Sequence, residues 1–232
     1  MIGHALAAGA IGLALILLAV EPAGAEPDIN NGRLIAVGGG SGGPQTACFS
    51  CHGVDGVGDG TGAFPRLAGQ SAFYLYKQLK DYAAETRPND IMTPIARALT
   101  DAEMEDVAAY YASADADYLP PPEADPILLQ HGGALAAVGS QEKGVQACVS
   151  CHGPGGTGMP PSFPYLAGQY TSYMELQFQL WQDGIRRNDP LDVMADIAMR
   201  LSQQDIRAVS LYFETVRPPV RRGAGRLDAP TE

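Results

Sequence analysis

Two Cys-x-x-Cys-His pentads are the part of this sequence best suited to chemistry, and they contain all four of its cysteines. On one turn of helix, cysteines three residues apart share a face, so their thiols can form thioethers to the two vinyl groups of one porphyrin. The histidine that follows can then bind the iron. This is the attachment pattern of c-type haem. The sequence therefore predicts two covalently bound haem c groups, with Cys48, Cys51, Cys148 and Cys151 as the attachment residues and His52 and His152 as proximal iron ligands.

Other kinds of site also use paired cysteines. A four-cysteine zinc site usually draws its pairs from segments about 15–20 residues apart, whereas the first cysteines here lie 148 − 48 = 100 residues apart. A thioredoxin-like dithiol needs a βαβ context, and no β-branched strand precedes either pair. A disulfide framework suits an exported chain but does not explain the histidine after each pair. The pentads favour haem, with zinc and disulfides as the alternatives.

Composition limits the partners. The 232 residues are enough for one large domain or two of about 100 residues. A domain of about 100 residues buries only a modest core, so each haem should act as core as well as reaction centre. The formal net charge of −11 argues against nucleic acid and anionic lipid as partners. It is compatible with steering towards a basic patch on a redox protein.

The first 25 residues resemble an export signal. Residues 1–20 are almost wholly apolar, and Ala23-Gly24-Ala25 looks like a signal-peptidase site. The alternative is an uncleaved membrane anchor, since about 20 apolar residues can span a bilayer; the clearly apolar part, 5–20, is shorter. Either way we expect the folded part in the periplasm, with membrane association only through an uncleaved N-terminus.

The pentads lie in a longer tandem repeat. Phe64–Gln70 (FPRLAGQ) matches Phe163–Gln169 (FPYLAGQ), and Arg87–Asp90 matches Arg187–Asp189. Later, Ile-Ala and Leu-Thr of the first copy match Ile-Ala and Leu-Ser of the second. Two copies of one unit, each with its own haem, are therefore expected.

A proline-rich stretch separates the copies. The segment 118–126 holds four prolines, which favour an extended, fairly stiff connector. We therefore divide the chain into a signal segment at 1–25, a first domain at 26–118, a linker at 119–126 and a second domain at 127–232. The second domain ends in a basic, Pro/Gly-rich tail.

Periodicity predicts an all-α fold. Thr100 with Glu103 forms a capping box, and Ser202 with Asp205 a weaker one. Each is followed by an apolar stripe at i, i+3, i+4 and i+7, namely Met104, Val107, Ala108 and Tyr111, then Ile206, Val209, Ser210 and Phe213. Further helices are expected near 31–37 and 126–138, over about 70–82 and 169–183, and at each pentad.

Each iron also needs a sixth ligand or an open position. His4 lies in the export signal and His131 on a helix expected to pack, so histidine cannot close both irons of a processed chain. A methionine thioether is a good haem ligand and raises the potential. Met92 and Met194 each lie three residues before an Ile-Ala pair, which makes them the predicted ligands. Met199 is the reserve in the second unit.

Together these residues resemble the tandem dihaem cytochrome c4 family, from about Asn30 to Val216. The pattern consists of the paired CxxCHG motifs, Phe-Pro-x-Leu-Ala-Gly-Gln, the late methionine before Ile-Ala, and the run 110–113, Tyr-Tyr-Ala-Ser. The resemblance implies two all-α class I cytochrome c domains related by a pseudo-twofold axis. It also implies that the carbonyls of Pro65 and Pro164 accept hydrogen bonds from the proximal histidines, which would tune the irons.

Two departures from the family pattern stand out. The second unit has three more residues than the first between its Asn-Asp pair and Met194, and the first unit has a glycine-rich insert at 38–43.

The resemblance implies a periplasmic electron carrier that takes electrons from a membrane donor and feeds a terminal oxidase. Two six-coordinate haems leave no place for a substrate at iron, and the redox chemistry belongs to the cofactor. One alternative is the electron-accepting subunit of a flavoprotein such as sulfide dehydrogenase. A dihaem enzyme, such as a thiosulfate dehydrogenase or peroxidase, is the third hypothesis; it would need an open or unusually ligated iron.

Overall fold

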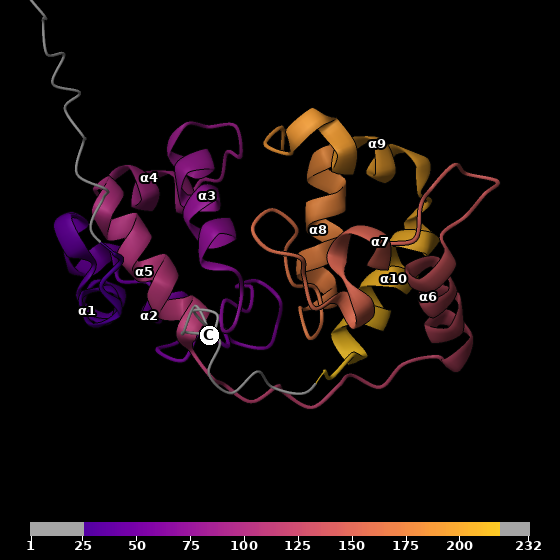
Figure 1. Cartoon of the computed structure of the whole chain (residues 1–232), viewed down its shortest axis with the longest axis horizontal. Coiled ribbons are helices and arrows are strands. Elements are labelled where there is room, and N and C mark those ends of the chain that lie inside the picture. Colours follow the sequence, from indigo (N-terminus) through magenta and orange to yellow (C-terminus); the bar gives the residue numbers. More distant parts are fainter. Residues whose placement is uncertain (1–25, 219–232) are drawn as a thin grey trace, which may run out of the picture.

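The computed structural model describes residues 26–218 (Figure 1). The predicted export signal at 1–25 and most of the basic tail, with Arg221, Arg222 and Arg226, lie outside the described residues. The helices of the first half are α1 (Ile29–Gly38), α2 (Phe49–His52), α3 (Ala72–Ala83), α4 (Met92–Arg97) and α5 (Asp101–Ser113). Those of the second half are α6 (Pro126–Val138), α7 (Val149–His152), α8 (Thr171–Gln182), α9 (Val193–Arg200) and α10 (Gln203–Thr215).

The predicted all-α fold is confirmed. The same order of helices occurs twice, and the two halves lie side by side with α3 and α8 in the middle (Figure 1). Between residues 26 and 218 the only β pairing is two isolated bridges, 140 with 145 and 159 with 163. Over the same stretch, no helix is long and apolar enough to cross a membrane.

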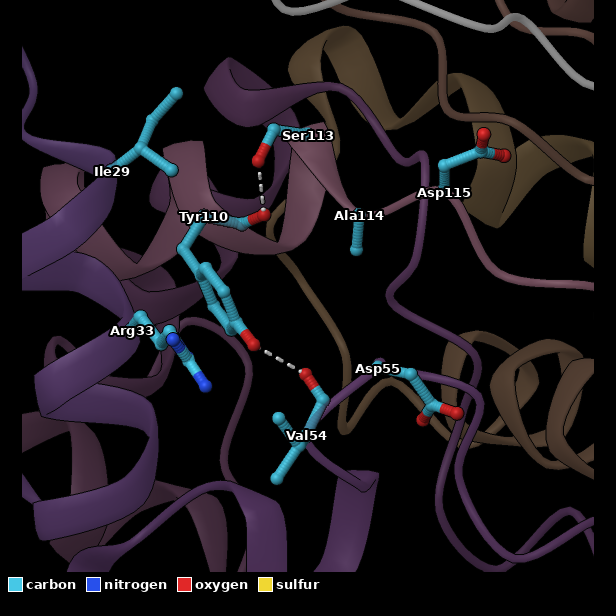
Figure 2. A pocket seen from close by; sticks show the side chains of 8 residues that line it. All are labelled: Ile29, Arg33, Val54, Asp55, Tyr110, Ser113, Ala114 and Asp115. Carbon is cyan, nitrogen blue, oxygen red and sulfur yellow. Dashed lines mark hydrogen bonds between the residues drawn. The ribbon is translucent and has the colours of Figure 1, made fainter.

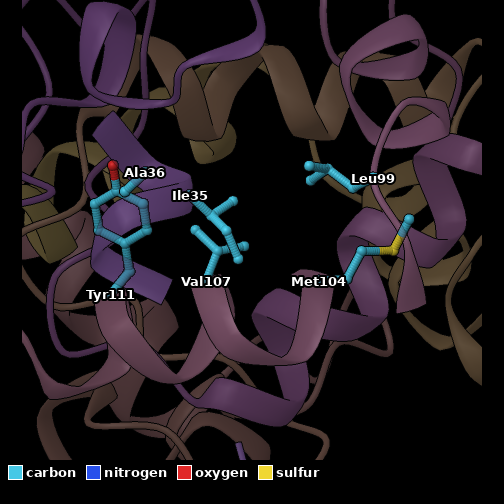
Figure 3. Close-up of a cluster of buried hydrophobic side chains, with 6 residues drawn as sticks. All are labelled: Ile35, Ala36, Leu99, Met104, Val107 and Tyr111. Atoms are coloured by element: carbon cyan, nitrogen blue, oxygen red, sulfur yellow. The ribbon is translucent and has the colours of Figure 1, made fainter. Parts of the chain in front are cut away.

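Each half is built on its last helix. α5 packs against α1 and α3, and α10 against α6 and α8. Both capping boxes form, at Thr100 with Glu103 and at Ser202 with Asp205. Both predicted apolar stripes are buried. Figure 3 shows Met104, Val107 and Tyr111 along one face of α5, within a cluster completed by Ile35, Ala36 and Leu99.

A glycine sets how closely each first helix approaches the last one. A Cβ built on Gly32 of α1 would lie 2.1 Å from the carbonyl oxygen of Asp106 in α5. A Cβ on Gly132 of α6 would lie 2.0 Å from the carbonyl oxygen of Ala208 in α10. Only glycine permits this backbone approach, so the tight crossing is encoded in both halves.

The loops before the pentads dock on the capping boxes. The glycine-rich insert of the first half forms a short 3₁₀ turn, Gly40–Gly42, in which the Ser41 backbone N–H and hydroxyl donate to Glu103 at 2.8 and 2.9 Å. In the second half, Lys143 forms an ion pair with Asp205. Each loop is thus fastened to the acid that caps the helix beneath it.

The connector has no regular structure between Ser113 and Pro126, and Pro126 is already the first residue of α6. It runs along one side of both halves (Figure 1). Arg66 of the first half holds it: its guanidinium lies 4.5 Å from the ring centroid of Tyr118 and donates to the carbonyl of Asp117 at 2.9 Å. These contacts anchor the connector to the unit that precedes it.

Candidate haem sites

Both pentads have the same local geometry. Cys48 and Cys148 immediately precede the short helices α2 and α7, and the N–H groups of His52 and His152 each donate to the carbonyl of the first cysteine at 2.9 Å. Glycines with φ of 76° and 75° end the two helices. A single turn of helix therefore carries both cysteines and the histidine, as attachment to one porphyrin requires.

The two pentad histidines are buried and oriented. His52 and His152 are each 7% exposed. Nδ1 of His52 lies 3.1 Å from the carbonyl oxygen of Pro65, and Nδ1 of His152 lies 2.9 Å from that of Pro164. Because a carbonyl can only accept, Nδ1 carries the proton and Nε2 is left with a free lone pair. Burial lowers the pKa of both imidazoles, against the opposing effect of these hydrogen bonds, and so favours the neutral, metal-binding form.

The cysteines do not support the alternative readings. None of the four is in a disulfide. Within residues 26–218 no group of three or more His, Cys, Asp or Glu side chains is placed to hold a metal ion such as zinc. Burial raises the pKa of Cys48 and of Cys148 to about 11, so neither is a ready thiolate. All four sulfurs become thioethers once haem is attached.

Met92 and Met194 occupy corresponding places, at or next to the first residue of α4 and α9. Both side chains are half-buried. The Met92 backbone N–H donates to the side chain of Asn89 at 2.8 Å, and that of Met194 to the side chain of Asp189 at 2.7 Å. An Asn or Asp side chain therefore holds the backbone of each methionine near the start of its helix.

The extra residues of the second unit bulge outwards. Leu191 and Asp192 have φ of 60° and 54°, and Leu191 is 95% exposed. The bulge lies between Asp189 and Met194, and the hydrogen bond that joins these two residues spans it. The reserve candidate Met199 is 66% exposed.

Two further methionines and His131 have structural roles. Met104 is in the first core, as its place in the apolar stripe predicts, and Met174 is in the second. Nε2 of His131 lies 2.8 Å from Oδ1 of Asp205, so this histidine supports a helix cap.

The boundary between the halves contains a polar network that the sequence analysis missed. Nη1 of Arg87 donates to Gln78 at 2.8 Å, and Nη2 donates to Gln177 at 2.6 Å and to the hydroxyl of Tyr173 at 2.7 Å. Arg186 makes the mirrored set: Nη1 to Gln177 at 2.9 Å, and Nη2 to Gln78 and to the hydroxyl of Tyr74, both at 3.3 Å.

This symmetry corrects the repeat alignment by one residue. Arg186, which is 5% exposed, is the counterpart of Arg87, whereas Arg187, which the sequence analysis paired with Arg87, is exposed. The pairs Gln78 with Gln177, and Arg87 with Arg186, are 99 residues apart. Following that spacing through both copies would have paired Arg87 with Arg186, but the spacing does not show which side chains meet across the boundary.

The network has properties that suit haem. Within the described part of the chain, neither Arg87 nor Arg186 forms a salt bridge with a carboxylate. Arg186 stacks 4.1 Å from the ring centroid of Trp181, whose buried indole N–H has no hydrogen-bond partner. Buried cations need counter-charge, and a buried donor needs an acceptor. The carboxylates of a bound haem could supply both, so the residues present fit the cofactor.

A shallow hollow on the first unit is not part of this arrangement. Figure 2 shows Tyr110 of α5 donating to the carbonyl of Val54, at 2.6 Å, in the loop just after the pentad. Arg33, Asp55 and Asp115 also line the hollow. Its charges are mixed, and the Tyr110 contact mainly fastens the haem loop to α5.

A helical unit closed around a Cys-x-x-Cys-His motif and repeated once defines a dihaem c-type cytochrome, and comparison with known proteins agrees. The cytochrome c family model matches residues 43–115. The thiosulfate dehydrogenase electron acceptor of Stutzerimonas stutzeri is 40% identical over 88% of this chain and 93% of its own length. Cytochrome c4 of Thiocapsa roseopersicina is 42% identical over 72% of this chain and 85% of its own length.

The fold gives the same answer. The crystal structure of reduced recombinant cytochrome c4 from Pseudomonas stutzeri matches with a TM-score of 0.72 and 34% identity, covering 82% of this chain and all of that one. The chain belongs to the dihaem cytochrome c4 family. It binds two covalent haem c groups and carries electrons.

Proposed function

We propose that this protein is a periplasmic shuttle that accepts electrons from a sulfur-oxidising dehydrogenase and delivers them to a terminal oxidase. The observation that carries the proposal is the 40% identity, over 88% of the chain, to a protein named for accepting electrons from thiosulfate dehydrogenase. Oxidative coupling of two thiosulfate ions through a new S–S bond releases two electrons. Two haems hold that number, one each.

In this proposal the irons are closed on both sides. His52 and Met92 bind the first iron, and His152 and Met194 bind the second, with the thioethers at Cys48, Cys51, Cys148 and Cys151 holding the porphyrins. The carbonyls of Pro65 and Pro164 orient the histidines. The side chains of Asn89 and Asp189 accept from the backbone N–H groups of Met92 and Met194 and so position both residues. The bound haems supply the one-electron chemistry, and the chain tunes and insulates them. In this proposal the linker at 119–126 separates the first cytochrome c domain, 26–118, from the second, 127–232.

Substitution of the methionines tests the ligand set. Met92→Ala and Met194→Ala should each remove half of the sulfur-to-ferric-iron charge-transfer absorption and lower the potential of one haem. Met199→Ala is the matched control, because this exposed side chain lies on the same helix as Met194. If Met199→Ala produced the loss and Met194→Ala did not, the ligand of the second unit would be wrongly assigned.

Rapid mixing tests the electron donor. The oxidised protein should be reduced in milliseconds by thiosulfate dehydrogenase supplied with thiosulfate, taking up two electrons per chain. Thiosulfate alone is the control and should not reduce it. The flavoprotein hypothesis predicts the opposite pattern, with rapid reduction only by a flavin-containing sulfide dehydrogenase and sulfide. No reduction by the thiosulfate enzyme would refute the proposed donor.

A further inference from the structure

Two glutamine side chains form hydrogen bonds across the boundary between the halves, one in each direction. Gln169 accepts from the backbone N–H of Arg66 and donates to its carbonyl, both at 3.0 Å. Gln70 does the same to Tyr165, at 2.9 and 3.0 Å. The glutamines are 8% and 7% exposed. Each one therefore clamps the backbone of a single residue in the opposite unit.

The orientation of each side-chain amide is set by converging donors. Oε1 of Gln169 also accepts from the N–H of Tyr170 at 3.1 Å, and Oε1 of Gln70 from that of Ser71 at 2.9 Å. Two backbone N–H groups thus point at one side-chain atom, which must be the oxygen. This is the only amide orientation that satisfies all hydrogen-bond partners. In it, the glutamine oxygens accept from the N–H groups of Arg66 and Tyr165.

Each clamped N–H belongs to the peptide group that holds a haem histidine. The amide joining Pro65 to Arg66 accepts from His52 through its C=O, at 3.1 Å, and donates to Gln169 through its N–H. The amide after Pro164 connects His152 to Gln70 in the same way. Hydrogen bonds at the two ends of one amide polarise each other. Donation to the glutamine makes the proline carbonyl a stronger acceptor and the imidazole a stronger iron ligand.

We propose that Gln70 and Gln169 are positioning residues that tune the haem of the opposite unit, so that each potential depends on the closed boundary. Gln169 acts on the haem held by His52, and Gln70 on the haem held by His152. A more electron-rich imidazole stabilises ferric iron, so both clamps lower the potential. The proposal rests on the proposed role of His52 and His152 as proximal ligands.

The crossed pattern gives a sharp test in the intact two-haem protein. Gln169→Leu should raise the potential of the first haem and leave the second unchanged, whereas Gln70→Leu should do the reverse. Cooperative strengthening of one hydrogen bond by its neighbour is modest, and we expect about a two- to threefold change in the reduction equilibrium. That is ~18–28 mV, since tenfold is 59 mV for one electron. The Nδ1 proton resonance of the opposite histidine, in reduced protein labelled with ¹⁵N-histidine, should move in the same crossed manner.

Two further variants separate tuning from a general loosening of the boundary. Ser172→Ala removes another cross-boundary hydrogen bond, from the Ser172 hydroxyl to the carbonyl of Thr61 at 2.9 Å, and should move neither histidine resonance. Gln169→Glu keeps the acceptor and should not reproduce the rise in potential. Equal shifts of both haems, a shift confined to the mutated unit, or a Glu variant that behaves like Leu would overturn the proposal. Failure of the ligand assignment is distinguishable, because the wild-type protein would then lack one axial-histidine resonance.

Discussion

Replacing Gly32 by alanine should loosen the first unit, because its α-hydrogen faces the backbone of α5. The new Cβ would start 2.1 Å from the carbonyl oxygen of Asp106, so α1 must move by roughly 1 Å to reach ordinary contact. A gap of 0.5–1 Å forfeits about a quarter to a half of a dispersion contact. The contacts at risk join Ile35 and Ala36 to Val107 and Tyr111. Overpacking of a core costs about 1–3 kcal/mol, and we expect a loss of about 2–3 kcal/mol here.

Guanidinium denaturation of the haem-loaded protein, followed by far-ultraviolet circular dichroism, measures this cost. Gly132→Ala should give a similar loss in the second unit, where the Cβ would lie 2.0 Å from the Ala208 oxygen. Gly38→Ala is the matched control: it is also in α1 but has nothing within 4 Å of its Cβ. It should be neutral or stabilising by up to ~1 kcal/mol. If Gly32→Ala were as stable as Gly38→Ala, the close approach of α1 to α5 would not depend on glycine.

Two further predictions concern buried polar groups. Burial alone would raise the pKa of Asp205, but hydrogen bonds from Lys143, Ser202 and His131 hold it well below the usual value; Asp205→Asn should cost about 2 kcal/mol near neutral pH. A carboxyl group whose pKa is lower in the folded than in the unfolded protein stabilises the fold above the unfolded pKa of ~3.9, and this contribution is lost as the pH falls. In acid titrations the difference in unfolding free energy between wild type and Asp205→Asn should therefore shrink below about pH 4. A constant difference would contradict this prediction. Gln78→Leu should lower the free energy of unfolding by about 2–4 kcal/mol in thermal unfolding, because three donors lose their acceptor. Gln179 is exposed, so Gln179→Leu is the control and should change stability little. Equal effects of the two substitutions would show that the network is not stabilising.

The elements that depend on local spacing could be predicted from the sequence. The pentads, the capping boxes and the stripe from Met104 to Tyr111 each lie within one helix, where neighbours in sequence are neighbours in space. The helix predicted over 126–138 matches α6, and those predicted over 70–82 and 169–183 are within two residues of α3 and α8.

What could not be predicted depends on how the two units meet. Gln70 and Gln169 mark the repeat in the sequence, but their hydrogen bonds go to residues 95 and 103 positions away. Arg87 was aligned with Arg187 because both begin similar runs, and only the buried network shows that Arg186 has its role. Contacts across a pseudo-twofold boundary leave no periodic signal in one chain.

The central claim, a two-haem electron carrier with both irons closed, is tested most directly by spectropotentiometric titration of the purified protein, with carbon monoxide then added to the reduced form. We predict two one-electron steps per chain, low-spin spectra in both oxidation states, and little carbon monoxide binding near neutral pH, because Met92 and Met194 occupy the sixth positions in the proposed ligand set. One electron per chain, a high-spin haem in the native state, or ready carbon monoxide binding at either iron would contradict it.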